Sequence, residues 1–214
     1  MQLIIGNKNY SSWSLRPWIF MRTLKIDFDE IRIALYNNDA ATRLSRYFSG
    51  GKVPVLVDGD TVIWDSLAIL EYLSETYLAG KGWPVDPGKR AFARSISAEM
   101  HSSFQSLRSE LPMNCRRNST GKSLSMDVQR DIDRIISIWE KCRSENSGDG
   151  AWLFGAYSIA DAMYAPVVLR FNTYGVPLNG VLQDYGRHVL NQPELLEWIE
   201  AARSETEVLA KFEV

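Results

Sequence analysis

The chain has 214 residues, with 24 lysines and arginines against 26 aspartates and glutamates, so its formal net charge is −2. This near-neutral balance gives no electrostatic reason to expect nucleic-acid binding. The two cysteines and two histidines form no C-x-x-C or H-x-x-x-H pair, which argues against a metal site and against a disulfide scaffold. No apolar run approaches the ~20 residues of a membrane span, and the first residues do not resemble a signal peptide. We therefore expect a cytoplasmic protein.

The first eighty residues alternate between strand-like and helix-like patterns. In chain order we expect a strand at 2–6, a helix from about 14 to 24, a strand at 28–35, a short helix at 38–47, strands at 53–57 and 61–64, and a helix at 67–78. The first strand–helix–strand unit implies a right-handed crossover with parallel strands, and the Asp58-Gly59 turn implies an antiparallel hairpin after it. This order is typical of a thioredoxin-like α/β domain.

The rest of the chain has a helical pattern. Residues 81–88 are rich in Gly and Pro, so we expect a linker there. Beyond it, apolar spacing predicts helices at 89–111, 125–146, 162–171 and 193–203. Ser158 and Asp161 have the spacing of a capping box before the third of these helices. We therefore predict a thioredoxin-like domain at 1–80, a linker at 81–88 and an all-α domain at 89–214.

Pro54 opens the first strand of the hairpin directly after Gly-Gly-Lys and Val53. An ordinary trans proline at a strand start is one interpretation. The other is a cis proline, which in thioredoxin-like folds turns the N–H and C=O of the preceding residue outward, where an extended peptide can pair with them. The surrounding strand pattern favours the cis form.

Asp65 and Ser66 precede the helix at 67–78, and one of them suffices as its cap. The second is then spare. Free N–H groups and a hydroxyl at a helix start suit a carboxylate, and an aspartate suits an ammonium group. The pair therefore suits the zwitterionic head of an amino acid.

Ser11 and Ser12 lie just before the predicted start of the first helix. They could be no more than a polar loop and a cap. A hydroxyl at the positive end of a helix also stabilises a thiolate, and lowering a thiol pKa by two units needs about 2.7 kcal/mol. A serine hydrolase is disfavoured, because there is no G-x-S-x-G elbow and few histidines could act as the base.

These segments together resemble the cytosolic glutathione S-transferases over essentially the whole chain. The matching segments are Ser11-Ser12-Trp13-Ser14-Leu15-Arg16, 52–56, 65–73, and 154–162 with its capping box. The opening turn is most similar to serine-type classes, zeta in particular, and to bacterial members. The resemblance implies a thioredoxin-like domain followed by an all-α domain, and an enzyme that activates glutathione as thiolate for attack on a soft electrophile. It also implies a homodimer, glutathione as co-substrate and no metal.

The resemblance also assigns residues to glutathione. Ser11 by zeta-like spacing, or Ser12 by counting back from Arg16, activates the thiol. The implied binding residues are Lys52 for the glycyl carboxylate, Val53 with cis Pro54 for the cysteinyl backbone, Asp65 and Ser66 for the γ-glutamyl group, and Gln105 as a further contact.

The electrophile is expected between the two domains, against the segment 111–117. Its predicted residues are Tyr10 as a pocket wall, Met113, and Arg116 and Arg117 as a clamp for an anionic electrophile. A solvated charged loop is the alternative. The zeta isomerases carry an arginine where this chain has Thr173, with Arg170 one turn earlier. A maleylacetoacetate isomerase-like activity, or a non-catalytic glutathione-binding module, therefore remains an alternative function.

Overall fold

The first part of the chain forms a four-stranded sheet in a computed structural model, which describes residues 1–213. The strands are β1 (Gln2–Ile5), β2 (Asp29–Arg32), β3 (Val55–Asp58) and β4 (Thr61–Trp64), in the order β2-β1-β3-β4. β1 pairs with β2 in parallel, and β3 is antiparallel to both of its neighbours. The predicted crossover unit followed by a hairpin is confirmed.

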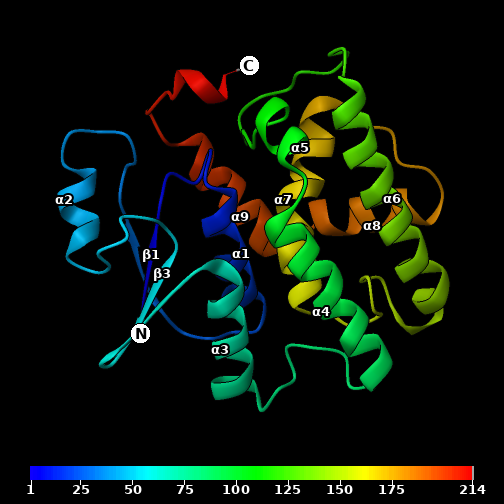
Figure 1. Ribbon diagram of the computed structural model, residues 1–214, viewed down its shortest axis with the longest axis horizontal. Helices are drawn as coiled ribbons and strands as arrows, with labels where there is room; N and C mark the ends of the chain where they lie inside the picture. The colour runs from blue at the N-terminus through cyan, green and yellow to red at the C-terminus, as the bar shows by residue number, and fades with distance from the viewer. Residues whose placement is uncertain (214) are drawn as a thin grey trace.

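Three helices flank this sheet, and the remainder of the chain is helical. Figure 1 shows α2 (Ala40–Ser45) on one side of the sheet, with α1 (Ser12–Thr23) and α3 (Ser66–Leu78) on the other. The later helices are α4 (Pro87–Ser102), α5 (Gln105–Glu110), α6 (Met126–Asn146), α7 (Ile159–Tyr174), α8 (Val181–Leu190) and α9 (Pro193–Arg203), with short 3-10 turns at Ser147–Asp149 and Ala210–Phe212. The fold class, a thioredoxin-like sheet region followed by helices, is as predicted.

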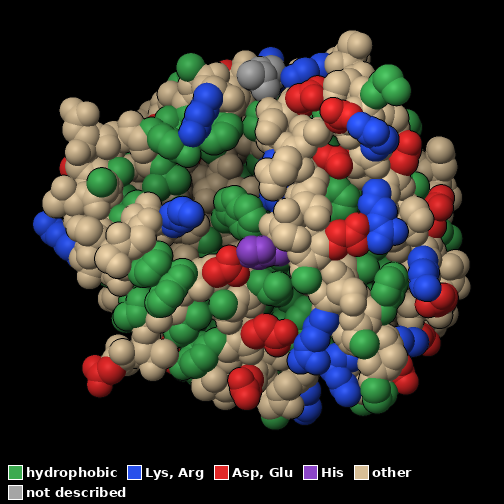
Figure 2. Space-filling view, viewed as in Figure 1, with side chains coloured by type: hydrophobic (Ala, Val, Ile, Leu, Met, Phe, Trp, Pro, Cys, Tyr) green, Lys and Arg blue, Asp and Glu red, His purple; other side chains and the backbone are tan. Residues whose placement is uncertain are grey.

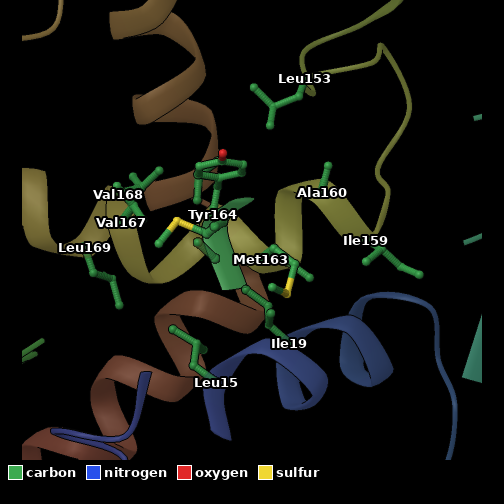
Figure 3. Close-up of a cluster of buried hydrophobic side chains, with 14 of the residues drawn as sticks. Leu15, Ile19, Leu153, Ile159, Ala160, Met163, Tyr164, Val167, Val168 and Leu169 are labelled. Carbon is green, nitrogen blue, oxygen red and sulfur yellow. The ribbon is translucent and has the colours of Figure 1, made fainter. Parts of the chain in front are cut away.

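The main core joins the two parts of the chain. Figure 3 shows Leu15 and Ile19 of α1 close to Met163 of α7, with Tyr164 on the other side of that helix. All four side chains are fully buried. Burying an aliphatic side chain of this size contributes roughly 1.5–3 kcal/mol. Helix α1 is therefore clamped between the sheet and α7, and its first turn is held at the junction of the two parts.

Several predicted boundaries are wrong. α1 begins at Ser12 rather than near Ser14, because Ser11 caps it by accepting the N–H of Ser14. Pro17 consequently lies inside the helix. The helix predicted over 89–111 is broken, because Phe104 adopts a left-handed conformation with φ 63° between α4 and α5.

The other differences are smaller. β2 covers four of the eight residues predicted for it, and α2 is shorter than the predicted helix at 38–47. α8 was missed altogether. The predicted linker at 81–88 ends with the start of α4, where the Asp86 side chain accepts the N–H of Lys89. The predicted capping box is confirmed: the Asp161 carboxylate accepts the Ser158 N–H at 2.9 Å.

Candidate active site

The turn between β1 and α1 presents Ser11 at the start of the helix. Ser11 Oγ lies 2.7 Å from Ser14 Oγ and accepts the Ser14 N–H, while Ser14 Oγ accepts the N–H of Gly6 at 3.1 Å. Ser14 is fully buried, so its hydroxyl needs an acceptor, and Ser11 Oγ is the one beside it. Ser11 then accepts twice and keeps its own hydrogen free to donate. With Ser14 as the donor of this pair, the Ser11 hydrogen is left available for another acceptor.

Ser12 is the first residue of α1 and has a different partner. Its Oγ accepts a hydrogen bond from Nη2 of Arg170 on α7, at 3.3 Å. Ser12 is 6% exposed and Ser11 is 7% exposed. The two candidate serines are therefore buried to a similar degree, and both hydroxyl oxygens accept hydrogen bonds from protein donors. The geometry alone does not decide which of the two contacts the thiol.

The peptide bond between Val53 and Pro54 is cis, as the strand pattern favoured. Pro54 is buried and precedes β3 directly, while Val53 is half-buried. Lys52 lies next to them in the loop and is exposed. The two residues assigned to the cysteinyl backbone therefore have the conformation that the resemblance implies. The role of Lys52 remains a prediction.

Asp65 is the N-terminal cap of α3, and Ser66 is the polar residue that is not needed for capping. Asp65 Oδ1 accepts the N–H groups of Leu67 at 2.9 Å and Ala68 at 3.3 Å. Ser66 begins the helix and is 1% exposed. A carboxylate and a hydroxyl are thus held side by side at a helix N-terminus, where the helix dipole favours an anion.

His101 reaches this site from the helical part of the chain, a contact that sequence reasoning missed. Its Nε2 lies 2.5 Å from Asp65 Oδ2, and its ring packs edge-on against Trp13, with the centroids 5.4 Å apart. The histidine therefore joins α4 to the cap of α3. The two residues are 36 positions apart, so no local pattern indicates the pair.

Trp13 also contacts two arginines. The guanidinium carbon of Arg16 lies 4.4 Å from the Trp13 ring centroid, and that of Arg108 lies 4.7 Å away. Burial lowers the pKa of Arg108, and burial together with repulsion from Arg108 and Arg170 lowers the pKa of Arg16. Two guanidinium groups therefore lie against the Trp13 ring, beside the serine turn.

Gln105 is the first residue of α5 and is exposed. It follows the break at Phe104, which re-aims the chain between α4 and α5. Its predicted contact with glutathione remains a prediction.

The residues predicted for the electrophile meet the C-terminal segment 205–213. Tyr10 donates its hydroxyl hydrogen to Glu213 Oε1 at 2.5 Å, and its ring stacks on Phe212 with centroids 5.3 Å apart. Arg116 donates to the Glu205 carbonyl at 2.5 Å and to the Glu207 carbonyl at 2.7 Å. This segment was given no role in the sequence analysis.

The other two residues predicted for the electrophile, Arg117 and Met113, also have partners within the protein. Arg117 Nη1 lies 3.7 Å from Glu213 Oε2, so its carboxylate partner comes from the same segment. Met113 is 1% exposed and packs in the main core rather than on an open wall. The segment 111–117 is therefore a docking surface for the C-terminal segment and not a solvated charged loop.

Glu205 fastens that segment to the turn that carries the serines. Its two carboxylate oxygens accept the backbone N–H of Lys8 at 2.7 Å and of Asn9 at 3.0 Å. Arg32 on β2 donates to the same carboxylate at 3.2 Å. In Figure 1 the C-terminal segment runs along the upper end of the space between the sheet region and the helices. Figure 2 shows the surface hollowed between these two parts, with hydrophobic side chains on the walls.

Comparisons with known proteins bear on this arrangement. The family model described as "Glutathione S-transferase, N-terminal domain" matches residues 10–76. The chain is 37% identical over 169 residues to a probable maleylacetoacetate isomerase of Caenorhabditis elegans, covering 79% of this chain and 78% of that protein. The chain belongs to the glutathione S-transferase family. A zeta-class glutathione S-transferase of Euphorbia esula is 31% identical over 172 residues, covering 76% of this chain and 74% of the relative.

Solved structures share the fold. A maleyl pyruvate isomerase described as a bacterial zeta-class glutathione S-transferase superposes with a TM-score of 0.73 at 18% identity, covering 97% of this chain and all of that one. A glutathione transferase homologue from Burkholderia strain BGR1, solved with bound glutathione, gives 0.71 at 21% identity, covering 95% and 98% of the two chains.

Residues 1–213 offer neither a metal site nor a membrane-spanning helix. No group of three histidine, cysteine, aspartate or glutamate side chains there is arranged to hold a metal ion. No helix in the same range is long and apolar enough to cross a membrane.

Proposed function

We propose that this transferase binds glutathione along the serine turn, the cis-proline loop and the start of α3, and holds it as thiolate for attack on a soft electrophile. One observation carries the proposal. Two helix N-termini carry polar side chains, Ser11–Ser12 at α1 and Asp65–Ser66 at α3, and Arg16 of α1 joins them by donating to Ser66 Oγ. One suits a thiolate and the other suits the amino-acid head of the same ligand.

In this proposal each group has a defined task. The backbone of Val53 pairs with the cysteinyl unit, Asp65 receives the γ-glutamyl ammonium, and Ser66 receives its carboxylate. Ser11 and Ser12 donate to the sulfur and lower its pKa. Lys52 and Gln105 add outer contacts. Catalysis then comes from ionising the thiol and from holding it beside the electrophile.

The electrophile is placed in the hollow between the two parts of the chain, below the C-terminal segment. We propose that Tyr10, Arg116 and Arg117 act there through the segment that they hold, since their polar atoms already have partners in it. The proposed assignment divides the chain into a glutathione domain at 1–80, a linker at 81–88 and an electrophile domain at 89–214. A cytoplasmic location fits this chemistry.

A homodimer is also proposed. Trp64 on β4 is 53% exposed and stacks on Phe48, with their ring centroids 4.4 Å apart. An exposed tryptophan on an edge strand, stacked on a half-buried phenylalanine, suits a second copy of the chain. Light scattering of the wild type and of Trp64→Ser tests this: a dimer that dissociates in the variant supports it, and a monomeric wild type contradicts it.

Conjugation of glutathione with an aryl halide tests the main proposal. Ser11→Ala and Ser12→Ala are compared with Ser95→Ala, whose hydroxyl bonds within α4. At least one of the first two variants should lose turnover while still binding glutathione by calorimetry. Wild-type protein that binds no glutathione would contradict the proposal.

Glutathione-dependent cis–trans isomerisation is the second candidate function. It is favoured by the relative described as a probable maleylacetoacetate isomerase. It needs the same thiolate, which adds reversibly to a double bond instead of displacing a leaving group. Assaying maleylacetoacetate beside the aryl halide decides which reaction dominates. A protein that binds glutathione without lowering the pKa of its thiol would instead be a non-catalytic binding module.

A further inference from the structure

Two buried arginines lie behind two serines of the proposed glutathione site. Arg170 on α7 donates from Nη2 to Ser12 Oγ at 3.3 Å, and Arg16 on α1 donates from Nη1 to Ser66 Oγ at 3.4 Å. Arg16 is fully buried and Arg170 is 4% exposed. Each arginine therefore lies on the protein side of a serine whose other side is proposed to face glutathione.

Within residues 1–213, neither arginine forms an ion pair with a carboxylate. Their remaining bonds go to backbone carbonyls, from Arg16 Nε to Met163 at 3.2 Å and from Arg170 Nε to Leu111 at 2.8 Å. Among the ion pairs formed within residues 1–213, none involves Arg16, Arg108 or Arg170. Arg16 Nη2 is buried without a hydrogen-bond partner. Unpaired buried charge is costly, which indicates a role that requires the charge.

The pKa of both groups reflects this environment. Burial and repulsion from Arg108 lower the pKa of Arg170 to about 9. Burial and repulsion from Arg108 and Arg170 lower the pKa of Arg16. Arg170 still carries its charge at neutral pH. The interior between α1, α3 and α7 is thus a region where an arriving anion gains electrostatic energy and relieves repulsion.

The hydrogen bonds have a defined direction. A guanidinium has donors and no acceptor, so the serine oxygen must accept. Each serine then keeps its own hydrogen, and in the described part of the chain neither the Ser12 hydroxyl nor the Ser66 hydroxyl has another hydrogen-bond partner. The hydrogen is therefore free to be donated away from the arginine.

We propose that Arg170 and Arg16 are positioning residues for glutathione, acting through the hydroxyls of Ser12 and Ser66. Arg170 turns the Ser12 hydroxyl hydrogen toward the thiolate, and Arg16 turns the Ser66 hydroxyl hydrogen toward the γ-glutamyl carboxylate. This inference rests on the proposed function, because it assumes that glutathione occupies the wall described above. It adds a second layer in which the thiolate and the γ-glutamyl carboxylate are each bound through one serine and one arginine.

The first experiment is a double-mutant cycle on the thiol. The pKa of bound glutathione is measured by thiolate absorbance in wild type, Arg170→Met, Ser12→Ala and the double variant. Arg170→Met should raise the thiol pKa by about one unit when Ser12 is present and leave it unchanged when Ser12 is absent. An equal rise in both backgrounds, or none in either, would overturn the role assigned to Arg170.

The second cycle uses S-methylglutathione, which keeps the γ-glutamyl carboxylate but has no thiol. Arg16→Met should weaken its binding about tenfold when Ser66 is present, and less than about twofold in the Ser66→Ala background. Arg170→Met should leave this affinity unchanged. Equal losses in both backgrounds would overturn the role assigned to Arg16.

Arg143→Met is the matched control for loss of a buried arginine. Arg143 on α6 is 7% exposed and also donates to a backbone carbonyl, that of Trp152, but it touches no serine of the site. It should lower thermal stability without moving either readout. If a Met variant does not fold, the corresponding Arg→Lys variant enters the same cycle and is judged by the same background dependence.

The proposed function and the role of the arginine–serine pairs can be disproved separately. A wild type that does not bind glutathione removes the proposed function and this inference together. A wild type that binds glutathione with a lowered thiol pKa, combined with cycles that show no coupling, removes only the arginine–serine pairs.

Discussion

The two walls of the cleft are held by different kinds of contact. The wall from the sheet region is built from local features: a helix cap at Ser11, a cis bond before Pro54, and a cap at Asp65. The wall from the helical region depends on a segment at the far end of the chain, which Glu205 and Arg116 tie to loops 89 to 197 positions away.

This difference indicates which wall is fixed before a ligand arrives. Helix caps belong to the framework of the fold, so the proposed glutathione wall is pre-organised. The opposite wall contains an end of the chain held by side-chain hydrogen bonds, so its shape changes when those bonds break. We expect glutathione recognition to be insensitive to the C-terminal segment and electrophile selection to depend on it.

The largest effect is expected from removing both hydroxyls of the serine turn. Ser11→Ala/Ser12→Ala should lower kcat by about 10²–10³-fold, as loss of donors to a developing anion does in other enzymes. Steady-state kinetics with saturating glutathione measures it. A double variant with unchanged kcat would place the activating donor on the other wall.

A large effect on binding is expected at Asp65. Asp65→Ala should raise the Kd for glutathione by at least about tenfold, because the ammonium loses its carboxylate. Asp86→Ala is the matched control, since Asp86 likewise caps a helix by accepting one N–H. Both variants should lose about 1 kcal/mol of stability from the missing cap. Equal glutathione affinity in the two variants would reduce Asp65 to a structural cap.

The sequence predicted the local features of the proposed glutathione wall, because each of them has a strong local signal. Serine pairs before helices, an X-Pro step at a strand start and an Asp-Gly hairpin are all read within a few positions. The supporting arginine and histidine were not found, because His101 meets Asp65 only after α4 packs beside α3. Arg170 likewise meets Ser12 across 158 positions.

The electrophile wall was misjudged for the same reason. Arg116 and Arg117 form a basic pair in the sequence, which suggested a free clamp for an anion. Their partners are carbonyls and a carboxylate of residues 205–213. The break at Phe104 was also missed, because the apolar spacing continues across it while the backbone does not.

A moderate and selective effect is expected from loosening the C-terminal segment. Arg116→Met removes the donors to the Glu205 and Glu207 carbonyls. The KM for the electrophile should change about three- to tenfold while the Kd for glutathione stays within about twofold. Arg134→Met, which breaks an exposed ion pair with Glu99, is the control. Equal changes in both constants would show that the walls are not independent.

The smallest effect is expected in the pH dependence of stability at Asp58. Hydrogen bonds from Tyr77 and Tyr72 lower the pKa of Asp58 below its usual 3.8. This stabilisation is fully present above the unfolded pKa and is lost as pH falls through the lower folded value. Asp58→Asn should therefore cost about 0.5–1 kcal/mol at pH 7 and progressively less as the pH falls below 3.8. Urea unfolding across this pH range measures it, and an equal cost at every pH would refute the assignment.

The pKa of the bound glutathione thiol shows whether the serine turn activates it. Thiolate absorbance of the wild-type complex, titrated from pH 5 to pH 10 with free glutathione as reference, gives the pKa of the bound sulfur. The pKa of a free thiol is about 8.5, and we expect the pKa of the bound thiol to be about two units lower. Glutathione that binds tightly but titrates like the free thiol would contradict activation by the serine turn.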